Sequence, residues 1–370
     1  TIRIVKGANM EMERVEASLH GWPQAPFQTK LDTDANYKRM VDFALRSENL
    51  AAVRPGIASH NLFDISYALV LAVEADALSG LQFEMLEGMA NHQRRALHEL
   101  TKSVLLYAPA CQKEDFIHAI GYLVRRLDEN TGDENFLRHA FNITVESDAW
   151  KLLEAGFLAS FERIADLSSE PRRQQDRRQE DLHALSKMGT AGDAVMTAKH
   201  RDQWYGFGNE PDTDFSLPAN SLWADQIVAA WVSQCGDQAA NVPLWIGNEV
   251  VNEQRVSKDS VDPSRDGTVV ARYVEANCDD VKASVDIADQ DLAGWGQLSA
   301  IERHQILRNV ASQVRKARGS LMGAALAEAG KTLLESDPEV SEAVDFIEFY
   351  SQSAVELDEI NGVASKGRGV

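Results

Sequence analysis

The chain has 370 residues, of which 44% are hydrophobic and 25% are charged, and its formal net charge is −20. This length exceeds what one compact core usually needs, so at least two domains are expected. The negative charge repels phosphate backbones and argues against nucleic acid as a partner. Three widely spaced cysteines outside any CxxC motif predict reduced thiols in the cytoplasm and no metal site.

The first 140 residues alternate between strand-like and helix-like segments. Apolar runs predict strands at 2–8, 51–60, 81–88 and 103–109. Longer amphipathic segments predict helices at 32–47, 62–79, 89–101 and 113–129. This alternation is typical of a parallel sheet made of βα units. Four units amount to half of an eight-fold barrel, or to most of a small doubly wound sheet.

Polar residues gather where these predicted strands end. They include Lys6, His60, Asn61, Glu87 and Tyr107. Ligands of barrels and of open α/β sheets bind at the carboxyl ends of the strands, so a site is expected here. Ordinary strand-to-helix turns, which favour Gly, Asn, Ser and Pro, explain the same residues about equally well.

The remaining chain divides into an irregular stretch and a more regular one. Residues 165–240 are rich in charge, Gly and Pro and predict a partly ordered connector, in which the arginines at 172–178 indicate a solvated helix face rather than a nucleic-acid patch. Beyond it, 242–251 and 267–276 predict strands, and 278–295, 299–330 and 337–357 predict helices. Ser299 with Glu302 forms a capping-box pattern, and Gly330 is a stop signal for the long middle helix.

Several motifs carry a resemblance to known enzymes. "RIVKGA" (3–8), "SHN" (59–61), "YAP" (107–109) and "YLVRRLDEN" (122–130) resemble the second half of the proline dehydrogenase barrel. The helices containing "GWGQLSAIERHQILRNVA" (294–311) and "LAEAGKTLLESDPEVSEAVDFIEFYSQ" (326–352) are similar to the N-terminal part of the aldehyde dehydrogenase superfamily. Together with "NEPDTDF" (209–215), this order resembles the bifunctional proline utilisation A family.

The resemblance implies an α/β fold in three parts. Residues 1–164 would form the C-terminal half of a (βα)8 barrel, 165–240 a connector, and 241–370 the N-terminal helical portion of an aldehyde dehydrogenase-like α/β domain. Because the chain starts within a strand and ends without a closing helix, we expect a fragment of a longer enzyme that is inactive by itself. The groups missing for both activities would lie outside it.

The family's activities define the expected chemistry. They are oxidation of L-proline to 1-pyrroline-5-carboxylate with FAD, and oxidation of L-glutamate γ-semialdehyde to glutamate with NAD. The resemblance also implies a quinone as electron acceptor, peripheral contact with the inner membrane, and a homo-oligomer. Two alternatives stay open: a non-catalytic interaction scaffold derived from these domains, and another βα-barrel flavin oxidoreductase acting on a small carboxylate.

The adjacent Arg125 and Arg126 are the expected substrate carboxylate clamp, because two guanidinium groups offer charge-assisted hydrogen bonds to one carboxylate. By resemblance, Tyr107 and Tyr122 wall the pocket, and Glu129 orients an arginine. Basic residues favoured by the negative end of a helix dipole are the simpler reading of the same pair. The motifs elsewhere in the sequence favour the clamp.

The cofactor-binding residues also follow from the resemblance. Arg3 would stabilise the negative charge of the reduced flavin and, with Tyr107 and Tyr122, form the catalytic set. The complete expected cofactor set is Arg3, Val5, Lys6, Gly7, Ala8, Lys30, Thr33, His60 and Asn61. This chain departs from the family at Asn9, where relatives carry a tyrosine that would cover the substrate. None of the three cysteines has the context of the aldehyde dehydrogenase nucleophile.

Overall fold

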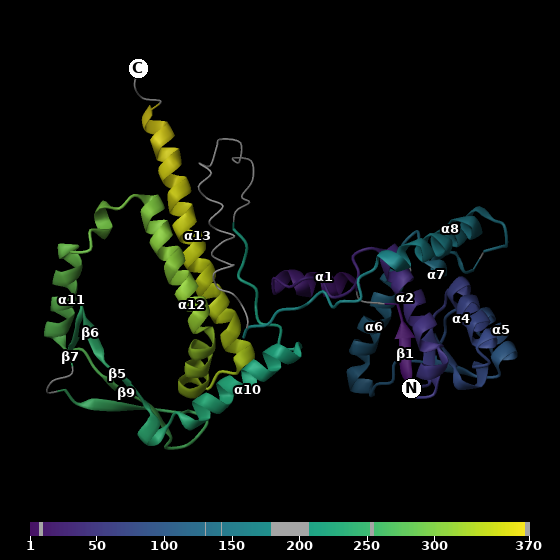
Figure 1. The fold of residues 1–370 in the computed structure, drawn as a ribbon, viewed down its shortest axis with the longest axis horizontal. Coiled ribbons are helices and arrows are strands. Elements are labelled where there is room, and N and C mark those ends of the chain that lie inside the picture. The colour runs from purple at the N-terminus through teal and green to yellow at the C-terminus, as the bar shows by residue number, and fades with distance from the viewer. Residues whose placement is uncertain (7–9, 130, 142, 179–206, 252–254, 367–370) are drawn as a thin grey trace. The chain divides into compact units, whose positions relative to one another are not determined.

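The computed structural model describes residues 1–6, 10–129, 131–141, 143–178, 207–251 and 255–366, without the side chains of 125–129 and 361–366. The chain forms two compact units (Figure 1). Unit 1 comprises Thr1–Leu19 and Pro23–Arg172, and unit 2 comprises His20–Trp22 and Arg173–Val370.

Unit 1 is built around a four-stranded parallel sheet. Its strands are β1 (Ile2–Val5), β2 (Pro55–Ala58), β3 (Gln82–Leu86) and β4 (Val104–Tyr107). They lie side by side in chain order, and every neighbouring pair is parallel. Each strand begins and ends within the range expected from the sequence. The prediction of a parallel sheet made of βα units is confirmed.

One face of this sheet is covered by helices. These are α2 (Lys30–Ala44), α4 (Leu62–Glu74) and α5 (Asn91–Thr101). The core comes from alternate strand residues, such as Ile4, Ile57 and Phe83, and from helix residues such as Tyr37 and Ile65. All of these side chains are buried. The strand residues among them share one face of the sheet, because successive side chains along a strand point to opposite faces.

The other face of the sheet carries Arg3, Gly56, Glu84 and Tyr107, which alternate with the core residues. Helix α6 (Phe116–Glu129) lies on the other side of β1 from α2 (Figure 1). Its apolar side chains remain exposed in this chain, namely Phe116, Ile117, Ile120, Leu123 and Val124. In a closed (βα)8 barrel this second face would be the interior.

Further helices of unit 1 were not expected from the sequence. They are α1 (Met10–Leu19), α3 (Ser47–Leu50), α7 (Phe136–His139) and α8 (Asp148–Arg163). Helix α8 packs on α2 and α4. It contributes Phe157 and Phe161, which pack against Phe63 and Tyr67 of α4. This aromatic contact ties α8 to the helical layer over the sheet.

The described part of unit 2 contains an ordered helix inside the stretch that the sequence predicted as a partly ordered, irregular connector. Helix α10 (Pro218–Ser233) starts at a proline, which suits the first turn because its missing N–H has no intrahelical partner there. The strands that follow are β5 (Ala240–Val242), β6 (Leu244–Ile246), β7 (Glu249–Val251), β8 (Ser257–Val261) and β9 (Val269–Val274). They form a sheet in the order β5-β9-β8 and a β6-β7 hairpin.

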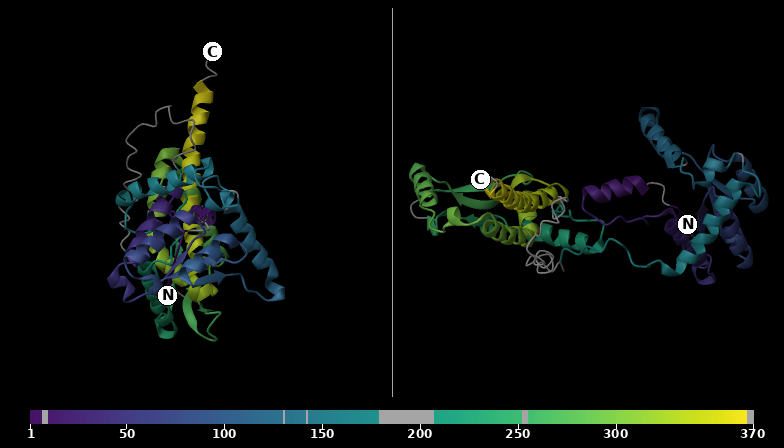
Figure 2. Two further views of the ribbon diagram at one scale, coloured as in Figure 1. Left: turned by 90° about the vertical axis from the view of Figure 1, so that its right-hand side faces the viewer. Right: turned by 90° about the horizontal axis from the view of Figure 1, so that it is seen from above.

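The rest of unit 2 is helical, with α11 (Cys278–Gln290), α12 (Ala300–Ala329) and α13 (Leu333–Lys366). The predicted Ser299 and Glu302 capping box is present, and Gly330 ends α12 with φ of 67°, so both predictions are confirmed. Helix α13 starts earlier than expected because Thr332 and Glu335 bond each other's backbone N–H, as a capping box does. Helices α12 and α13 run side by side (Figure 2).

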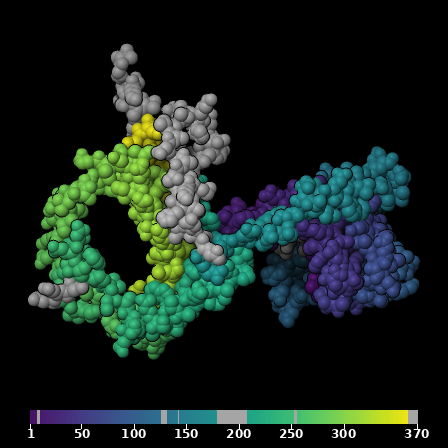
Figure 3. All heavy atoms as spheres, viewed as in Figure 1, coloured from purple at the N-terminus to yellow at the C-terminus, as the bar shows by residue number. Residues whose placement is uncertain are grey.

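Unit 2 is open in the middle, between α11 on one side and α12 on the other (Figure 3). Short 3-10 helices connect the elements of both units. They are η1 (Leu78–Gly80), η2 (Lys113–Asp115), η3 (Ile164–Asp166), η6 (Gly236–Gln238) and η7 (Trp295–Gln297). Within the described part of the chain, no helix combines the length and apolarity needed to cross a membrane.

Candidate functional site

The clearest polar feature on the second face of the unit 1 sheet is an ion pair between Arg3 and Glu84. The Nε atom of Arg3 on β1 donates to Oε2 of Glu84 on β3, and the Glu84 side chain is 5% exposed. These strands are separated by β2, where Gly56 is the register partner of Arg3. A Cβ atom at Gly56 would lie 2.3 Å from Oε1 of Glu84. The glycine therefore leaves the space that lets the carboxylate reach across a whole strand.

Two tyrosines extend this cluster. The Cζ atom of Arg3 lies 5.1 Å from the centroid of the Tyr107 ring, at the end of β4. The Tyr107 and Tyr122 rings lie 6.2 Å apart at an angle of 56°. Tyr122 belongs to α6, so this helix and the second face of the sheet meet at aromatic rings. The three residues expected to be catalytic are therefore neighbours in space.

A second cluster lies at the carboxyl end of β1. Lys6 Nζ lies 2.6 Å from Oδ1 of Asp34 and 2.5 Å from Oδ2 of Asp64. Lys30, four residues before Asp34 on α2, bonds the other Asp34 oxygen at 2.5 Å. Asp34 thus forms ion pairs with both Lys6 and Lys30, two lysines of the expected cofactor set. Burial alone would lower the pKa of Lys6, but the charges of Asp64 and Asp34 together raise this pKa above its ordinary value.

The cluster continues into the core through Lys38, whose side chain is 1% exposed. Its Nζ lies 3.6 Å from Oδ1 of Asp64 and 4.3 Å from the centroid of the Phe157 ring. Burial lowers the pKa of Lys38, and the Asp64 charge opposes this effect. The described group contains three lysines and two aspartates, so it carries a surplus positive charge when every member is ionised. Such a surplus suits an anionic ligand.

His60 and Asn61 follow β2 and have local roles. His60 Nε2 accepts a hydrogen bond from the Leu86 backbone N–H at 3.0 Å, which leaves the proton of the neutral ring on Nδ1. Among the described residues, this buried Nδ1 has no hydrogen-bond partner. Burial lowers the pKa of His60 to about 4, so the ring is neutral at pH 7. Asn61 caps α4 by accepting from the Phe63 N–H at 3.0 Å.

The other expected site residues lie apart from these contacts or outside the description. Val5 lies on the second face of the sheet and is 50% exposed. Thr33 Oγ1 donates to the Thr29 carbonyl within the first turn of α2. Some predicted residues fall outside the described parts, namely the backbone of Gly7, Ala8 and Asn9 and the side chains of Arg125, Arg126 and Glu129. For them the site assignments remain predictions.

Sequence reasoning missed Glu84, Asp34, Asp64, Lys38 and Gly56. Two of them had a detectable signal. Asp34 follows Lys30 by four residues, which is a helical ion-pair spacing, and Glu84 is a lone charge inside an apolar strand. The ion pair between Arg3 and Glu84 had no signal in the sequence, because its partners are 81 residues apart.

Unit 2 contains a buried ionic network of a different kind. Arg318 of α12 bonds Asp337 of α13 and Glu210 of the "NEPDTDF" segment, both at 2.9 Å. Thr213 donates its backbone N–H and its hydroxyl to Asp337. Arg177, whose side chain is 4% exposed, donates to Thr213 Oγ1 at 2.9 Å. The prediction of a solvated helix face at 172–178 is therefore wrong, because these residues form no helix and Arg177 is buried against this segment.

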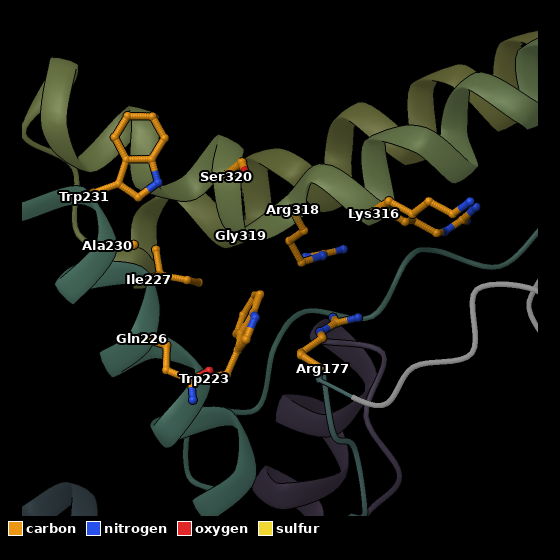
Figure 4. Close-up of a pocket in the computed structure, with 11 residues that line it drawn as sticks. Arg177, Trp223, Gln226, Ile227, Ala230, Trp231, Lys316, Arg318, Gly319 and Ser320 are labelled. Atoms are coloured by element: carbon orange, nitrogen blue, oxygen red, sulfur yellow. The ribbon is translucent and has the colours of Figure 1, made fainter. Parts of the chain in front are cut away.

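A cavity of about 360 Å³ lies beside this network, lined by Arg177, Trp223, Ile227, Arg315 and Arg318 among others (Figure 4). Arg315 and Arg318 both donate hydrogen bonds to the carboxylate of Glu210. Their charges are thus already compensated. We place the candidate site in unit 1, because cations and aromatic rings there gather near the carboxyl ends of parallel strands, where the ligands of such sheets bind.

Comparison with known proteins bears on both units. Residues 1–139 match the proline dehydrogenase family, and residues 250–369 match the aldehyde dehydrogenase family. The bifunctional protein PutA of Klebsiella aerogenes is 26% identical over 361 residues, which is 95% of this chain and 25% of that protein. One relative thus carries both parts in the same order. The resemblance to the bifunctional proline utilisation A family is confirmed.

Other relatives of this proline utilisation A-like chain agree. A crystal structure of proline utilization A from Bdellovibrio bacteriovorus, inactivated by N-propargylglycine, matches 96% of this chain and 33% of its own chain, with a TM-score of 0.71 and 25% identity. A 1-pyrroline-5-carboxylate dehydrogenase of Staphylococcus epidermidis is 28% identical over 41% of this chain and 29% of that protein. The chain spans between 25 and 29% of these curated relatives. The predicted α/β fold class, a barrel half followed by part of an aldehyde dehydrogenase-like domain, is confirmed.

Proposed function

We propose that this chain acts within a bifunctional enzyme of proline catabolism. Unit 1 would contribute to the FAD-dependent oxidation of L-proline to 1-pyrroline-5-carboxylate. Unit 2 would contribute to the NAD-dependent oxidation of L-glutamate γ-semialdehyde to glutamate. The observation that carries the proposal is the cluster of Arg3, Tyr107 and Tyr122 on the inner face of a proline dehydrogenase-like sheet.

The residues of unit 1 fit a flavin at two neighbouring places, which are the second face of the sheet and the carboxyl end of β1. The isoalloxazine ring is planar and rich in hydrogen-bond acceptors, and unit 1 offers the Arg3 guanidinium beside aromatic rings. Lys6 and Lys30 supply the positive charge that a diphosphate requires. The buried Nδ1 of His60 is a donor without a protein partner among the described residues. When bound, the flavin would accept the hydride that leaves proline.

The chain's own residues would bind and orient the substrate around this ring. Tyr107 and Tyr122 would form an aromatic wall beside the proline ring and exclude water from the reacting bond. Arg125 and Arg126 would hold the substrate carboxylate from the same helix as Tyr122, with Glu129 orienting one of them. Arg3 would place its positive charge where the flavin becomes electron-rich. A quinone as electron acceptor, peripheral membrane contact and a homo-oligomer belong to the same proposal.

The test uses the full-length enzyme that contains this chain. The purified protein is expected to carry FAD and to lose its flavin absorbance when L-proline is added without oxygen. With NAD and the semialdehyde, it is expected to form NADH and glutamate. If proline leaves the absorbance unchanged while dithionite bleaches it, the substrate is wrong. If no flavin is bound, the scaffold alternative is favoured instead.

A further inference from the structure

We propose that Glu84 is a positioning residue that sets the reduction potential of the flavin by neutralising Arg3. This inference rests on the proposed function, because it assumes that Arg3 lies beside the isoalloxazine ring. It adds to that function a carboxylate that acts on the cofactor only through another side chain. The structure gives three observations for it, and each concerns residues of unit 1.

The first observation is the geometry of the pair. Glu84 Oε2 accepts a hydrogen bond directly from Nε of Arg3. The carboxylate therefore holds the guanidinium at the nitrogen that is attached to the aliphatic part of the side chain. The Arg3 side chain is 43% exposed, whereas that of Glu84 is 5% exposed. The carboxylate is therefore the buried partner, and the outer part of the guanidinium remains available on the second face of the sheet. A carboxylate placed in this way fixes the orientation of the guanidinium, and the resulting ion pair has no net charge.

The second observation is the glycine between the two residues. Neighbouring strands lie about 4.8 Å apart, so a pair that spans β2 must cross a gap of about twice this distance. Gly56 sits in that gap, and a Cβ atom there would clash with the carboxylate of Glu84, 2.3 Å from its Oε1. The backbone φ of Gly56 is not positive, so the local backbone does not itself require glycine. Its missing side chain is what gives Glu84 access to Arg3.

The third observation is the location of the pair beside Tyr107. Arg3 lies 5.1 Å from the Tyr107 ring, and this ring contacts Tyr122 of α6. The neutralised cation therefore belongs to the same cluster as the proposed substrate wall. A carboxylate so close to that cluster opposes the build-up of negative charge on a reduced flavin. Its removal would let Arg3 stabilise the reduced form more strongly.

The experiment compares the flavin midpoint potential of the full-length enzyme with that of Glu84→Gln. The amide keeps the shape and an acceptor oxygen but loses the charge. The midpoint is expected to move to a more positive value, with the reduction equilibrium shifted about tenfold, or about 30 mV for a two-electron couple. Asp42→Asn is the matched control, because Asp42 is 49% exposed, pairs with Arg46 and lies on α2, which covers the opposite face of the sheet. Its midpoint is expected to equal that of the unmodified enzyme.

A second variant tests the same idea without removing a charge. In Gly56→Ala the new methyl group would displace the Glu84 carboxylate from Arg3, so the midpoint is expected to shift in the same direction by a smaller amount. This variant decides the question if Glu84→Gln does not fold. Flavin-loaded variants whose midpoints are unchanged or more negative would overturn the inference. An unmodified enzyme that binds no flavin would instead refute the proposed function.

Discussion

Arg318 and Asp337 are joined inside unit 2, with Nη1 of Arg318 donating to Oδ1 of Asp337 at 2.9 Å. The residues lie on α12 and α13 and are 3% and 1% exposed. Asp337 also accepts the backbone N–H and the hydroxyl of Thr213. One carboxylate thus connects two long helices to the segment before α10. Buried charges are tolerated when every partner is present, so this junction is sensitive to the loss of any one of them.

Replacement of Asp337 by alanine is expected to destabilise unit 2 by about 3–5 kcal/mol, because Arg318 and Thr213 lose a buried acceptor. Urea unfolding followed by tryptophan fluorescence measures the change. The control is Glu339→Ala, since Glu339 is 53% exposed and pairs with Lys331 at the surface. This control is expected to change the free energy of unfolding little. Equal losses in the two variants would contradict the assigned role of the junction.

Gly323 is expected to be intolerant of alanine. A Cβ atom there would lie 2.0 Å from the indole ring of Trp231, which packs α10 against α12. Overpacking of this kind costs about 1–3 kcal/mol, and the displaced ring is expected to change its fluorescence. Gly319→Ala is the milder comparison, because its Cβ would lie 3.2 Å from Trp223. An unchanged emission spectrum and unchanged stability in Gly323→Ala would show that the helices do not meet as described.

His60 is expected to make the stability of unit 1 depend on pH. Its folded pKa of about 4 lies below the unfolded value of 6.5, so the unfolded state binds more protons between these values. The stabilisation is complete above pH 6.5 and is lost as the pH falls towards 4, at up to about 1 kcal/mol per pH unit. Urea unfolding at pH 7 and pH 5 measures it.

His60→Gln serves as the comparison for that pH dependence. The glutamine carbonyl can accept the Leu86 N–H that His60 Nε2 accepts now, but it does not titrate. The variant is expected to lose less stability than the unmodified chain between pH 7 and pH 5. A pH dependence identical to that of the unmodified chain would mean that other groups cause it.

Asp64 is expected to be essential to unit 1, because it is 1% exposed and faces both Lys6 and Lys38. Asp64→Asn is expected to cost about 3 kcal/mol or more, since buried Lys38 loses its carboxylate. Adding Lys38→Met should restore part of this loss, which a double-mutant cycle would quantify. Asp42→Asn, which removes an exposed ion pair with Arg46, is the control. Additive effects of Asp64→Asn and Lys38→Met would refute the coupling.

The carboxylate clamp makes a kinetic prediction for the full-length enzyme. Changing both Arg125 and Arg126 to alanine is expected to weaken apparent proline binding by about 3 kcal/mol or more, because charged hydrogen bonds contribute about 1.5–3 kcal/mol each. The KM for proline measures this, and the flavin content serves as a check on folding. Flavin-loaded enzyme with an unchanged KM would exclude the clamp. Inhibition by a cyclic ether carboxylate, but not by an open-chain acid, would support proline as the substrate class.

Local sequence signals predicted much of the fold. The strands of unit 1 and the capping box at Ser299 depend on residues close together in the chain, so pattern and spacing were sufficient. Helix α10 was missed because its surroundings are rich in Gly and Pro. Helix α8 was missed too, and in the fold it is fixed by aromatic contacts with α4 that no local pattern encodes.

The sequence by itself determined the βα alternation, the two ends of helix α12 and the motifs that resemble the proline utilisation A family, because periodicity, capping and turn chemistry act over a few residues. Only the tertiary structure decided which charges meet. The Arg3–Glu84 pair depends on the strand order and on the space at Gly56, and Lys6 reaches Asp34 and Asp64 only when α2 and α4 pack on the sheet. Electrostatic contacts depend on the distance between charges in space, and the separation of two residues along the chain does not determine that distance.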